Sequence, residues 1–222
     1  MKFPASHYLK QRIKYHLRTS RRTHHTQPTV LFYCGLHRGA SFDNLFPDFD
    51  VCYAFEANPS LARRAKIKYF GLRNVHIVHA AVGFEDGHAD LHIASNQGES
   101  SSLGRFSREW SRAMNISALR TVRVPAVNLH NFCVRNRIDY ITEYISDLQG
   151  MDLEALKTLK PLLEAGAIQV VQCEVTQDAR KVYQDLPSNR EEDFERLLAG
   201  RYQKTSEFNV GTWEKDCRWE VK

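Results

Sequence analysis

From residue 30 onward, short apolar runs alternate with segments of helical spacing, and this alternation constrains the fold more than any other feature of the chain. The expected strands cover 30–34, 51–55, 75–78, 89–94, 121–127, 140–146, 168–175, 202–208 and 217–221. The expected helices cover 41–46, 61–70, 105–115, 153–163 and 191–198. Strands that alternate with helices form βαβ units, so we expect an α/β, Rossmann-like fold with a mostly parallel central sheet. The last two strands follow each other directly, which predicts a hairpin and one C-terminal antiparallel strand.

The positive charge of the chain is concentrated at its start. The net charge is +5, and residues 1–22 hold seven Lys or Arg and no acid, which leaves 5 − 7 = −2 for the rest. We therefore expect a basic N-terminal arm or helix over 1–28 and one domain over 29–222. The domain has no bulk charge that favours nucleic acid. For the arm, docking on its own domain, weak contact with an anionic membrane surface or a second subunit, and RNA contact all stay open.

The cysteines and histidines indicate in which compartment the protein works and whether it binds a metal. The five cysteines form no CxxC pair, and three of them lie in apolar runs, so we expect reduced core residues and a cytoplasmic protein. The histidines at 76, 79, 88 and 92 form no ligand pattern with a cysteine pair, so no metal is expected. A weakly held divalent cation on two acids at strand ends, Asp147 and Glu174, is the alternative.

A glycine loop and an acid follow the first two expected strands. Gly35 and Gly39 frame a Gly-x-x-x-Gly loop, which lets a ligand approach the backbone. Glu56 ends the next strand 21 residues after Gly35, the distance at which an acid accepts hydrogen bonds from ribose hydroxyls. The loop lacks the G-x-G-x-x-G spacing, and residues 36–38 would crowd a pyrophosphate. An adenosine cofactor without phosphates fits better, which indicates S-adenosyl-L-methionine.

A second acid lies where the strand at 140–146 meets the next helix. Ligands of open α/β sheets bind at the carboxyl ends of the strands, which places Asp147 in that crevice. Methyl transfer to a hydroxyl needs an acceptor held in line and a base that takes its proton. The competing interpretation is that Asp147 or Asp152 caps the helix at 153–163.

Several ordered blocks between residues 30 and 175 resemble the FkbM-type methyltransferases. They are the glycine loop, 55–59 (FEANP), 74–78 (NVHIV) with 80–83 (AAVG), 101–103 (SSL), 124–132, and 147–150 (DLQG) with 156–157. The resemblance implies a class I methyltransferase fold, S-adenosyl-L-methionine as methyl donor and a hydroxyl acceptor. In this family the acceptor is often a sugar of a glycan or of a glycosylated small molecule.

The chain also departs from the family pattern at three places. Residues 33–34 are Tyr-Cys where the family commonly has Asp. The Lys of the family's Lys-x-Asp-x-Glu-Gly pattern is missing, with Ser146 directly before Asp147, and Gln149 replaces the Glu. We therefore expect backbone amides and His37 to hold the methionine end of the cofactor. These departures keep open a catalytically silent binding module. RNA methylation is a third hypothesis, which only the basic arm supports.

The complete set of candidate site residues follows from these motifs and from the resemblance. Asp147 and Glu174, which ends an apolar strand on the same rim, are the expected catalytic residues. The expected cofactor-binding residues are Gly35, His37, Gly39, Glu56, Ala57, Ala81 and Asp147. The expected substrate-binding residues are Ser101, Ser102 and Gln149. Trp213, beside Gly211, is either a core residue or a platform for a sugar ring.

Overall fold

The computed structural model describes residues 27–177, 182–187 and 189–222. The basic arm expected over 1–28 lies almost entirely outside the described residues, and so do the contacts predicted for it. None of the helices in the described part of the chain is long and apolar enough to cross a membrane.

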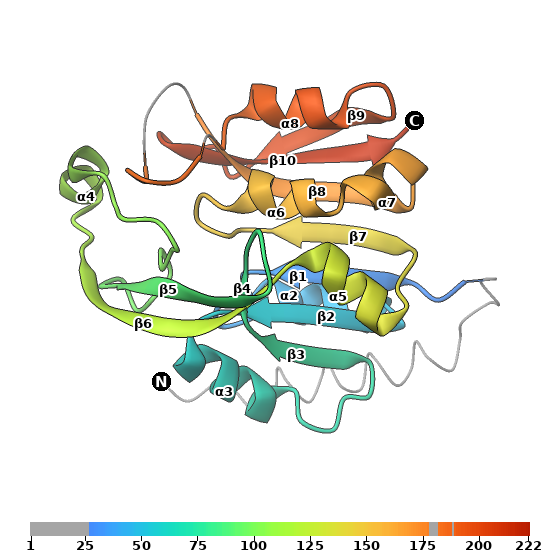
Figure 1. The fold of residues 1–222 in the computed structure, drawn as a ribbon, viewed down its shortest axis with the longest axis horizontal. Helices are drawn as coiled ribbons and strands as arrows, with labels where there is room; N and C mark the ends of the chain where they lie inside the picture. Colours follow the sequence, from blue (N-terminus) through green and yellow to red (C-terminus); the bar gives the residue numbers. More distant parts are fainter. Residues whose placement is uncertain (1–26, 178–181, 188) are drawn as a thin grey trace.

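A seven-stranded sheet forms the centre of the molecule (Figure 1). Its strands, in spatial order, are β3 (Val75–His79), β2 (Val51–Glu56), β1 (Val30–Cys34), β7 (Ile141–Ser146), β8 (Ile168–Thr176), β10 (Glu214–Val221) and β9 (Tyr202–Phe208). The first five are parallel, whereas β10 lies antiparallel between β8 and β9. The predicted parallel sheet with one antiparallel C-terminal strand is therefore confirmed.

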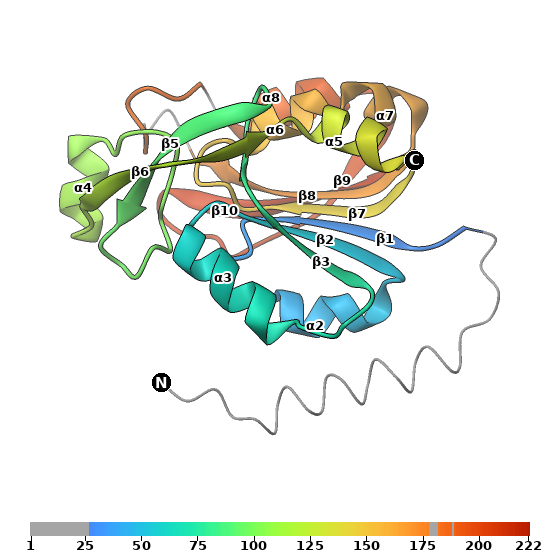
Figure 2. The same ribbon diagram turned by 60° about the horizontal axis from the view of Figure 1, so that its bottom comes forward.

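Helices cover both faces of this sheet (Figure 2). One face carries α2 (Phe42–Leu45), the short 3-10 helix Phe46–Asp48 and α3 (Pro59–Lys68). The other carries α5 (Leu129–Asn136), α6 (Asp152–Thr158), α7 (Lys160–Ala165) and α8 (Glu191–Leu198). The sequence pattern missed α5 and predicted one helix over 153–163. Pro161 explains the break, because it supplies no backbone N–H and is tolerated only in the first turn of a helix, here that of α7.

Residues 81–127 add a smaller three-stranded sheet at one end of the central one (Figure 2). Its order is β4 (Ala81–Val82), β6 (Ala118–Val127) and β5 (Gly87–Ala94), and α4 (Arg108–Met114) lies in the connection between β5 and β6. The strands β5 and β6 were expected, but their separate sheet was not. This insertion forms one wall of the site described below.

Apolar side chains from the sheet and its helices fill both interfaces. Phe194 of α8 stacks on Trp219 of β10 with ring centroids 5.7 Å apart, and Tyr144 lies fully buried beneath α6. Burial of one such large side chain contributes roughly 1.5–3 kcal/mol. All five cysteines are buried and free, as the sequence predicted.

Candidate active site

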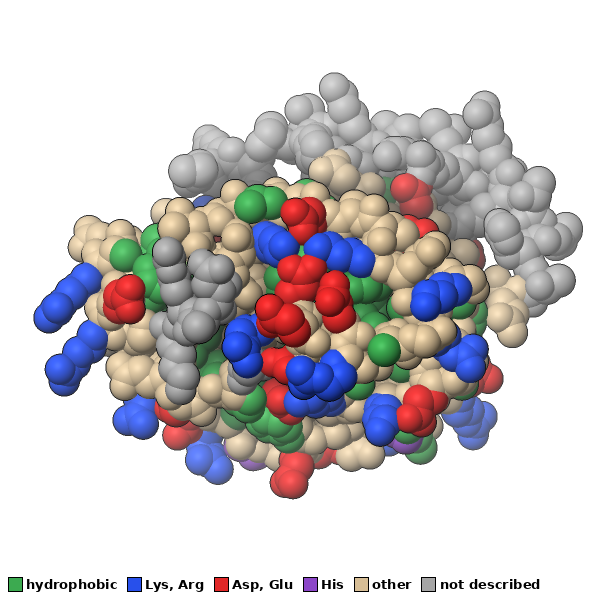
Figure 3. All heavy atoms as spheres, turned by 90° about the horizontal axis from the view of Figure 1, so that it is seen from above, with side chains coloured by type: hydrophobic (Ala, Val, Ile, Leu, Met, Phe, Trp, Pro, Cys, Tyr) green, Lys and Arg blue, Asp and Glu red, His purple; other side chains and the backbone are tan. Residues whose placement is uncertain are grey.

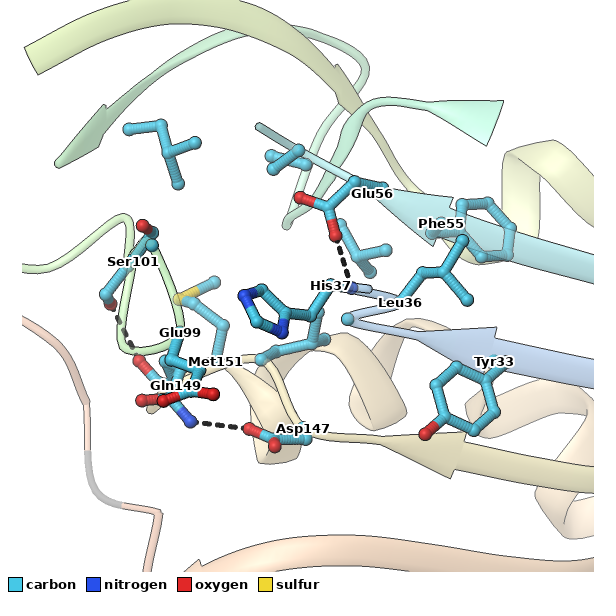
Figure 4. A pocket seen from close by; sticks show the side chains of 18 of the residues that line it. Tyr33, Leu36, His37, Phe55, Glu56, Glu99, Ser101, Asp147, Gln149 and Met151 are labelled. Carbon is cyan, nitrogen blue, oxygen red and sulfur yellow. Dashed lines mark hydrogen bonds between the residues drawn. The ribbon is translucent and has the colours of Figure 1, made fainter. Parts of the chain in front are cut away.

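The carboxyl ends of β1, β2 and β7 open into a pocket of about 370 Å³ (Figure 4). Backbone contacts join these strand ends: the N–H groups of Gly35 and Leu36 both donate to Phe55 O, at 3.1 and 3.0 Å. The N–H of Asp147 donates to Cys34 O at 3.0 Å. The pocket is of the size that small-molecule ligands occupy in proteins.

The two glycines of the loop are required by close packing. Gly35 has φ +91°, and a Cβ on it would lie 2.0 Å from the carbonyl oxygen of Asp147. Gly39 has φ +71°, and its Cβ would lie 2.1 Å from the hydroxyl of Tyr69. Both glycines line the pocket, and packing within the protein is by itself a reason for each. The approach of a ligand to their backbone stays a prediction.

Glu56 lies at the end of β2 with its carboxylate almost completely buried. Its Oε2 accepts the backbone N–H of His37 at 2.6 Å, and its Oε1 accepts the N–H of Asn58 at 2.7 Å. Burial raises the pKa of Glu56 to about 7, although both hydrogen bonds favour the charged form. A carboxylate has about four acceptor sites, so two of them stay available to ligand hydroxyls.

His37 points its imidazole into the same pocket (Figure 4). Its backbone is held at φ +49°, a conformation that non-glycine residues rarely adopt. Its backbone N–H donates to Glu56, so the side chain of His37 is the part that faces the pocket, and its contact with the methionine end of a cofactor stays a prediction. Within the described chain, the buried Nε2 of His37 has no hydrogen-bond partner. Burial lowers the pKa of His37, which keeps the ring neutral at pH 7.

Asp147 follows β7 and exposes its carboxylate to the pocket. Gln149, at φ +53°, donates from Nε2 to Asp147 Oδ1 at 2.5 Å, and its Oε1 accepts the hydroxyl of Tyr183 at 3.0 Å. Desolvation by the surrounding protein, together with nearby carboxylates, raises the pKa of Asp147. Asp152 is fully buried and instead accepts the N–H of Leu148 at 3.0 Å. The helix-capping role considered for either aspartate is taken by neither, because the N-cap of α6 is Met151 and no side chain caps the helix. Asp152 is the first residue of α6 and holds the loop after β7.

Glu174 lies level with Asp147, because Ser146 of β7 is in register with Cys173 of β8. Its carboxylate Oε2 is 3.4 Å from Gln149 Nε2. The predicted common rim is therefore present, but Glu174 lines a neighbouring cavity and not the pocket that holds Glu56. The strand also continues two residues further than Glu174, to Thr176.

The remaining candidates all line the pocket: Ala57, Ala81, Ser101, Ser102 and Gln149. The hydroxyl of Ser102 donates to Gln149 O at 2.7 Å and accepts the N–H of Gly104 at 3.0 Å. Ser101 Oγ accepts the N–H of Ala94 at 3.1 Å. These bonds fasten the small sheet to the loop after β7; contact with a substrate stays a prediction.

Further lining residues that were not among the predicted site residues include Leu91, Glu99 and Met151. The first two belong to the insertion, of which the sequence predicted only Ala81, Ser101 and Ser102 as site residues. Met151 follows the Asp147 loop directly and is buried. Its thioether and the Leu91 side chain give the pocket the apolar surface that an adenine ring requires.

One group of three potential metal ligands occurs in the part of the chain that the structure describes: Glu191, Glu207 and Cys217. Lys204 and Lys215 bind both carboxylates there, with Lys215 Nζ 2.8 Å from each. Figure 3 views the molecule from the side of α8 and β9, where acidic and basic side chains lie next to one another. The group is accounted for by ion pairs, and the absence of a metal stays a prediction.

The residues present fit an adenosine cofactor, since Glu56 keeps two acceptor sites and His37 an unpartnered nitrogen. The fold and this site define a class I methyltransferase that depends on S-adenosyl-L-methionine. The chain belongs to the FkbM methyltransferase domain family, whose model matches residues 34–199.

Several solved structures of low sequence identity are similar to this chain. The N-terminal domain of EvdMO1, determined with SAH and D-fucose, is 8% identical with a TM-score of 0.47, over 100% of this chain and 85% of that one. Magnesium protoporphyrin IX methyltransferase from Synechocystis PCC 6803, with bound SAM, is 10% identical with a TM-score of 0.44, over 97% and 80%. Fibrillarin from Aeropyrum pernix is 8% identical with a TM-score of 0.46, over 86% and 66%. A search of curated protein sequences gives no match.

Proposed function

We propose that the protein is an O-methyltransferase that methylates a sugar hydroxyl of a glycan or of a glycosylated small molecule. The observation that carries the proposal is the carboxylate of Asp147. It is exposed to the pocket, held by Gln149 at 2.5 Å, and shielded enough that desolvation raises its pKa. A carboxylate of raised pKa is a stronger base than a solvated one, which suits proton removal from a hydroxyl.

The residues divide the work between two sides of the pocket. Glu56 accepts the ribose hydroxyls, and the neutral ring of His37 offers an unpartnered nitrogen to the polar end of the cofactor. S-adenosyl-L-methionine supplies an electrophilic methyl group on a sulfonium. Asp147 holds the acceptor hydroxyl and takes its proton as the oxygen lone pair forms the new C–O bond. The S–C bond breaks, and its electron pair stays on sulfur as S-adenosylhomocysteine.

The sugar part of the proposal is supported by the second cavity, beyond Gln149. Carboxylates accept hydrogen bonds from several hydroxyls at once, and aromatic rings stack on sugar faces. Glu174 and Trp213 both line this cavity, which is about 420 Å³. Trp213 is 9% exposed, so it is largely a packing residue with one accessible edge.

The experiment is incubation with S-adenosyl-L-methionine labelled on its methyl group and a panel of monosaccharides, glycosides and glycans. We expect label on an oxygen of a sugar, located by mass spectrometry, and no transfer by Asp147→Asn. Transfer only to RNA or to nitrogen would contradict the proposal. Tight cofactor binding without transfer to any glycan would favour the silent binding module.

A further inference from the structure

The second cavity lies next to the cofactor pocket, because Glu174, which lines the cavity, is close to Gln149, which lines the pocket. The Nε2 of Gln149 is 2.5 Å from Asp147 and 3.4 Å from Glu174. The cavity is lined by Trp110, Ala113, Met114, Glu174, Asn209, Gly211, Thr212, Trp213, Glu214, Lys215 and Asp216. It is therefore the space next to the base from which an acceptor would approach.

The register of β8 with β7 and β10 brings acidic residues close together at this cavity. Asp216 of β10 lies directly opposite Glu174 of β8 in the antiparallel pair. Glu214 precedes Asp216 by two residues and so shares its face of the sheet. Asp147 lies level with Glu174 at the end of β7. Like charges directly opposite each other destabilise a sheet, so the pairing of Asp216 with Glu174 carries a cost.

The ion pairs formed among the described residues do not include these four acids. Across the described residues, no Lys or Arg nitrogen lies within ion-pair distance of Asp147, Glu174, Glu214 or Asp216. Lys215 lines the cavity but binds Glu191 and Glu207, each at 2.8 Å. Elsewhere on the same sheet, Glu143 does pair with an arginine, Arg218, at 2.6 Å.

Burial and mutual repulsion raise the pKa values of the acids in this cluster. Desolvation, followed by the charge of Asp147, raises the pKa of Glu214 to about 8. The same two causes, with Glu214 added, raise the pKa of Glu174. A positive group placed among these carboxylates would relieve the repulsion and return all of them to the charged form.

Aromatic surface completes the cavity. Trp110 is 2% exposed, and within the described chain its indole Nε1 has no hydrogen-bond partner. Buried indole N–H groups usually have a hydrogen-bond acceptor, and a ligand oxygen would supply one here. Tryptophan faces next to carboxylates are also the surroundings in which proteins bind organic ammonium groups.

We propose that this cavity is the acceptor subsite and that it selects a sugar bearing a positively charged amino group. The ammonium would lie among Glu174, Glu214 and Asp216, and the sugar hydroxyls would face Asp147 and the Trp110 indole. The inference rests on the proposed O-methylation of a sugar and narrows its substrate class to amino sugars.

The test is binding of three sugars that share one ring, measured by calorimetry or by ligand-observed NMR at pH 7 with S-adenosylhomocysteine present. Glucosamine carries an ammonium, N-acetylglucosamine a neutral amide and glucose a hydroxyl. We expect glucosamine to bind at least about tenfold more tightly than the other two, as for a desolvated ion pair or cation–π contact. Equal binding of the three sugars, or no binding, overturns the inference.

Substitutions test whether the preference for glucosamine arises in this cavity. Asp216→Asn and Glu214→Gln should each weaken the preference for glucosamine, whereas Asp139→Asn, which removes an exposed acid outside the cavity, should keep it. Stoichiometric binding of Mg²⁺ that Asp216→Asn abolishes would overturn the inference in favour of a metal site. Methyl transfer to neutral sugars alone would also overturn it, yet leave the proposed function standing. Failure to bind S-adenosyl-L-methionine, measured in a titration without sugar, would instead remove the proposed function.

Discussion

Gly35 and Asp147 touch through their backbones: a Cβ atom on the glycine would lie 2.0 Å from the carbonyl oxygen of the aspartate. The loop after β1 and the loop after β7 are therefore packed against each other. One carries predicted cofactor-binding residues and the other the proposed base. Their relative position is set by a contact that only glycine permits.

Replacing Gly35 by Ala should uncouple these loops. The change adds both the close contact and a strained φ of +91°, which costs about 1–3 kcal/mol before any displacement of Asp147. Urea denaturation should show the loss of stability, and calorimetry a weaker affinity for S-adenosylhomocysteine. Gly83→Ala is the matched control, because nothing lies within 4 Å of its Cβ. Equal stability of the two variants would contradict the packing role.

Cofactor affinity should rise with pH because of Glu56. Its carboxylate must be ionised to accept two ribose hydroxyls, and burial raises its pKa to about 7. Below that pH the affinity should therefore fall by up to about tenfold per pH unit. Calorimetry between pH 6 and 8 measures this slope. Glu56→Gln should flatten it, whereas Glu85→Gln, at an exposed position, should reproduce the wild-type slope.

Asp147→Asn should separate catalysis from cofactor binding. Loss of a positioned base lowers turnover by roughly 10²–10⁴-fold, and the acidic limb of the pH–rate profile should disappear. Affinity for S-adenosylhomocysteine should change little, because Glu56 and His37 remain. Steady-state kinetics on the methylated sugar, with Asp139→Asn as control, checks both. Full turnover in the variant would remove Asp147 from the reaction.

Tyr183 should act as a positioning residue through Gln149. Its hydroxyl donates to Gln149 Oε1, and the amide in turn fixes Asp147. Tyr183→Phe removes one bond worth about 0.5–1.5 kcal/mol and should shift the pH–rate profile of Asp147. Tyr202→Phe is a matched control, since its hydroxyl donates to Ile168 O at 2.8 Å, outside the residues that line the site. A shift of equal size in both variants would mean a general loss of stability.

The protein without cofactor should become less stable as pH rises. Burial raises the pKa of Glu56 and of Asp152 to about 7 and that of Glu214 to about 8. Between about pH 4.5 and 8 the folded chain therefore holds protons that the unfolded chain has released. Stability falls wherever the native state binds more protons, so Tm should be lower at pH 8.5 than at pH 5.5. Asp152→Asn should reduce this difference; a Tm that rises over this range would contradict the assignment.

The sequence pattern predicted the central sheet because its strands are short apolar runs whose signal is local. Glu56 and Asp147 could be placed for the same reason: each follows a strand directly, and parallel strands end at one edge. The helix Leu129–Asn136 was missed, although Leu129, Phe132 and Cys133 lie at helical spacing and the side chain of Asn128 caps the helix.

The second cavity could not be predicted from the sequence. It depends on the register between β8 and β10, which brings Asp216 opposite Glu174 across 42 residues of chain. One residue of slip would turn Asp216 to the other face. The role of Gly39 was also hidden, since it depends on Tyr69 from the far end of α3. Such contacts are set by tertiary packing and leave no periodic signal.

Calorimetric titration of the protein with S-adenosyl-L-methionine at pH 8 tests the central assignment most directly. We expect one site, with affinity reduced by about 10–100-fold in Glu56→Ala, the loss expected when a charged acceptor of two hydroxyls is removed. Glu85→Ala should bind as the wild type does. No heat of binding to the wild type, or equal affinity in Glu56→Ala, would contradict a cofactor site built on Glu56.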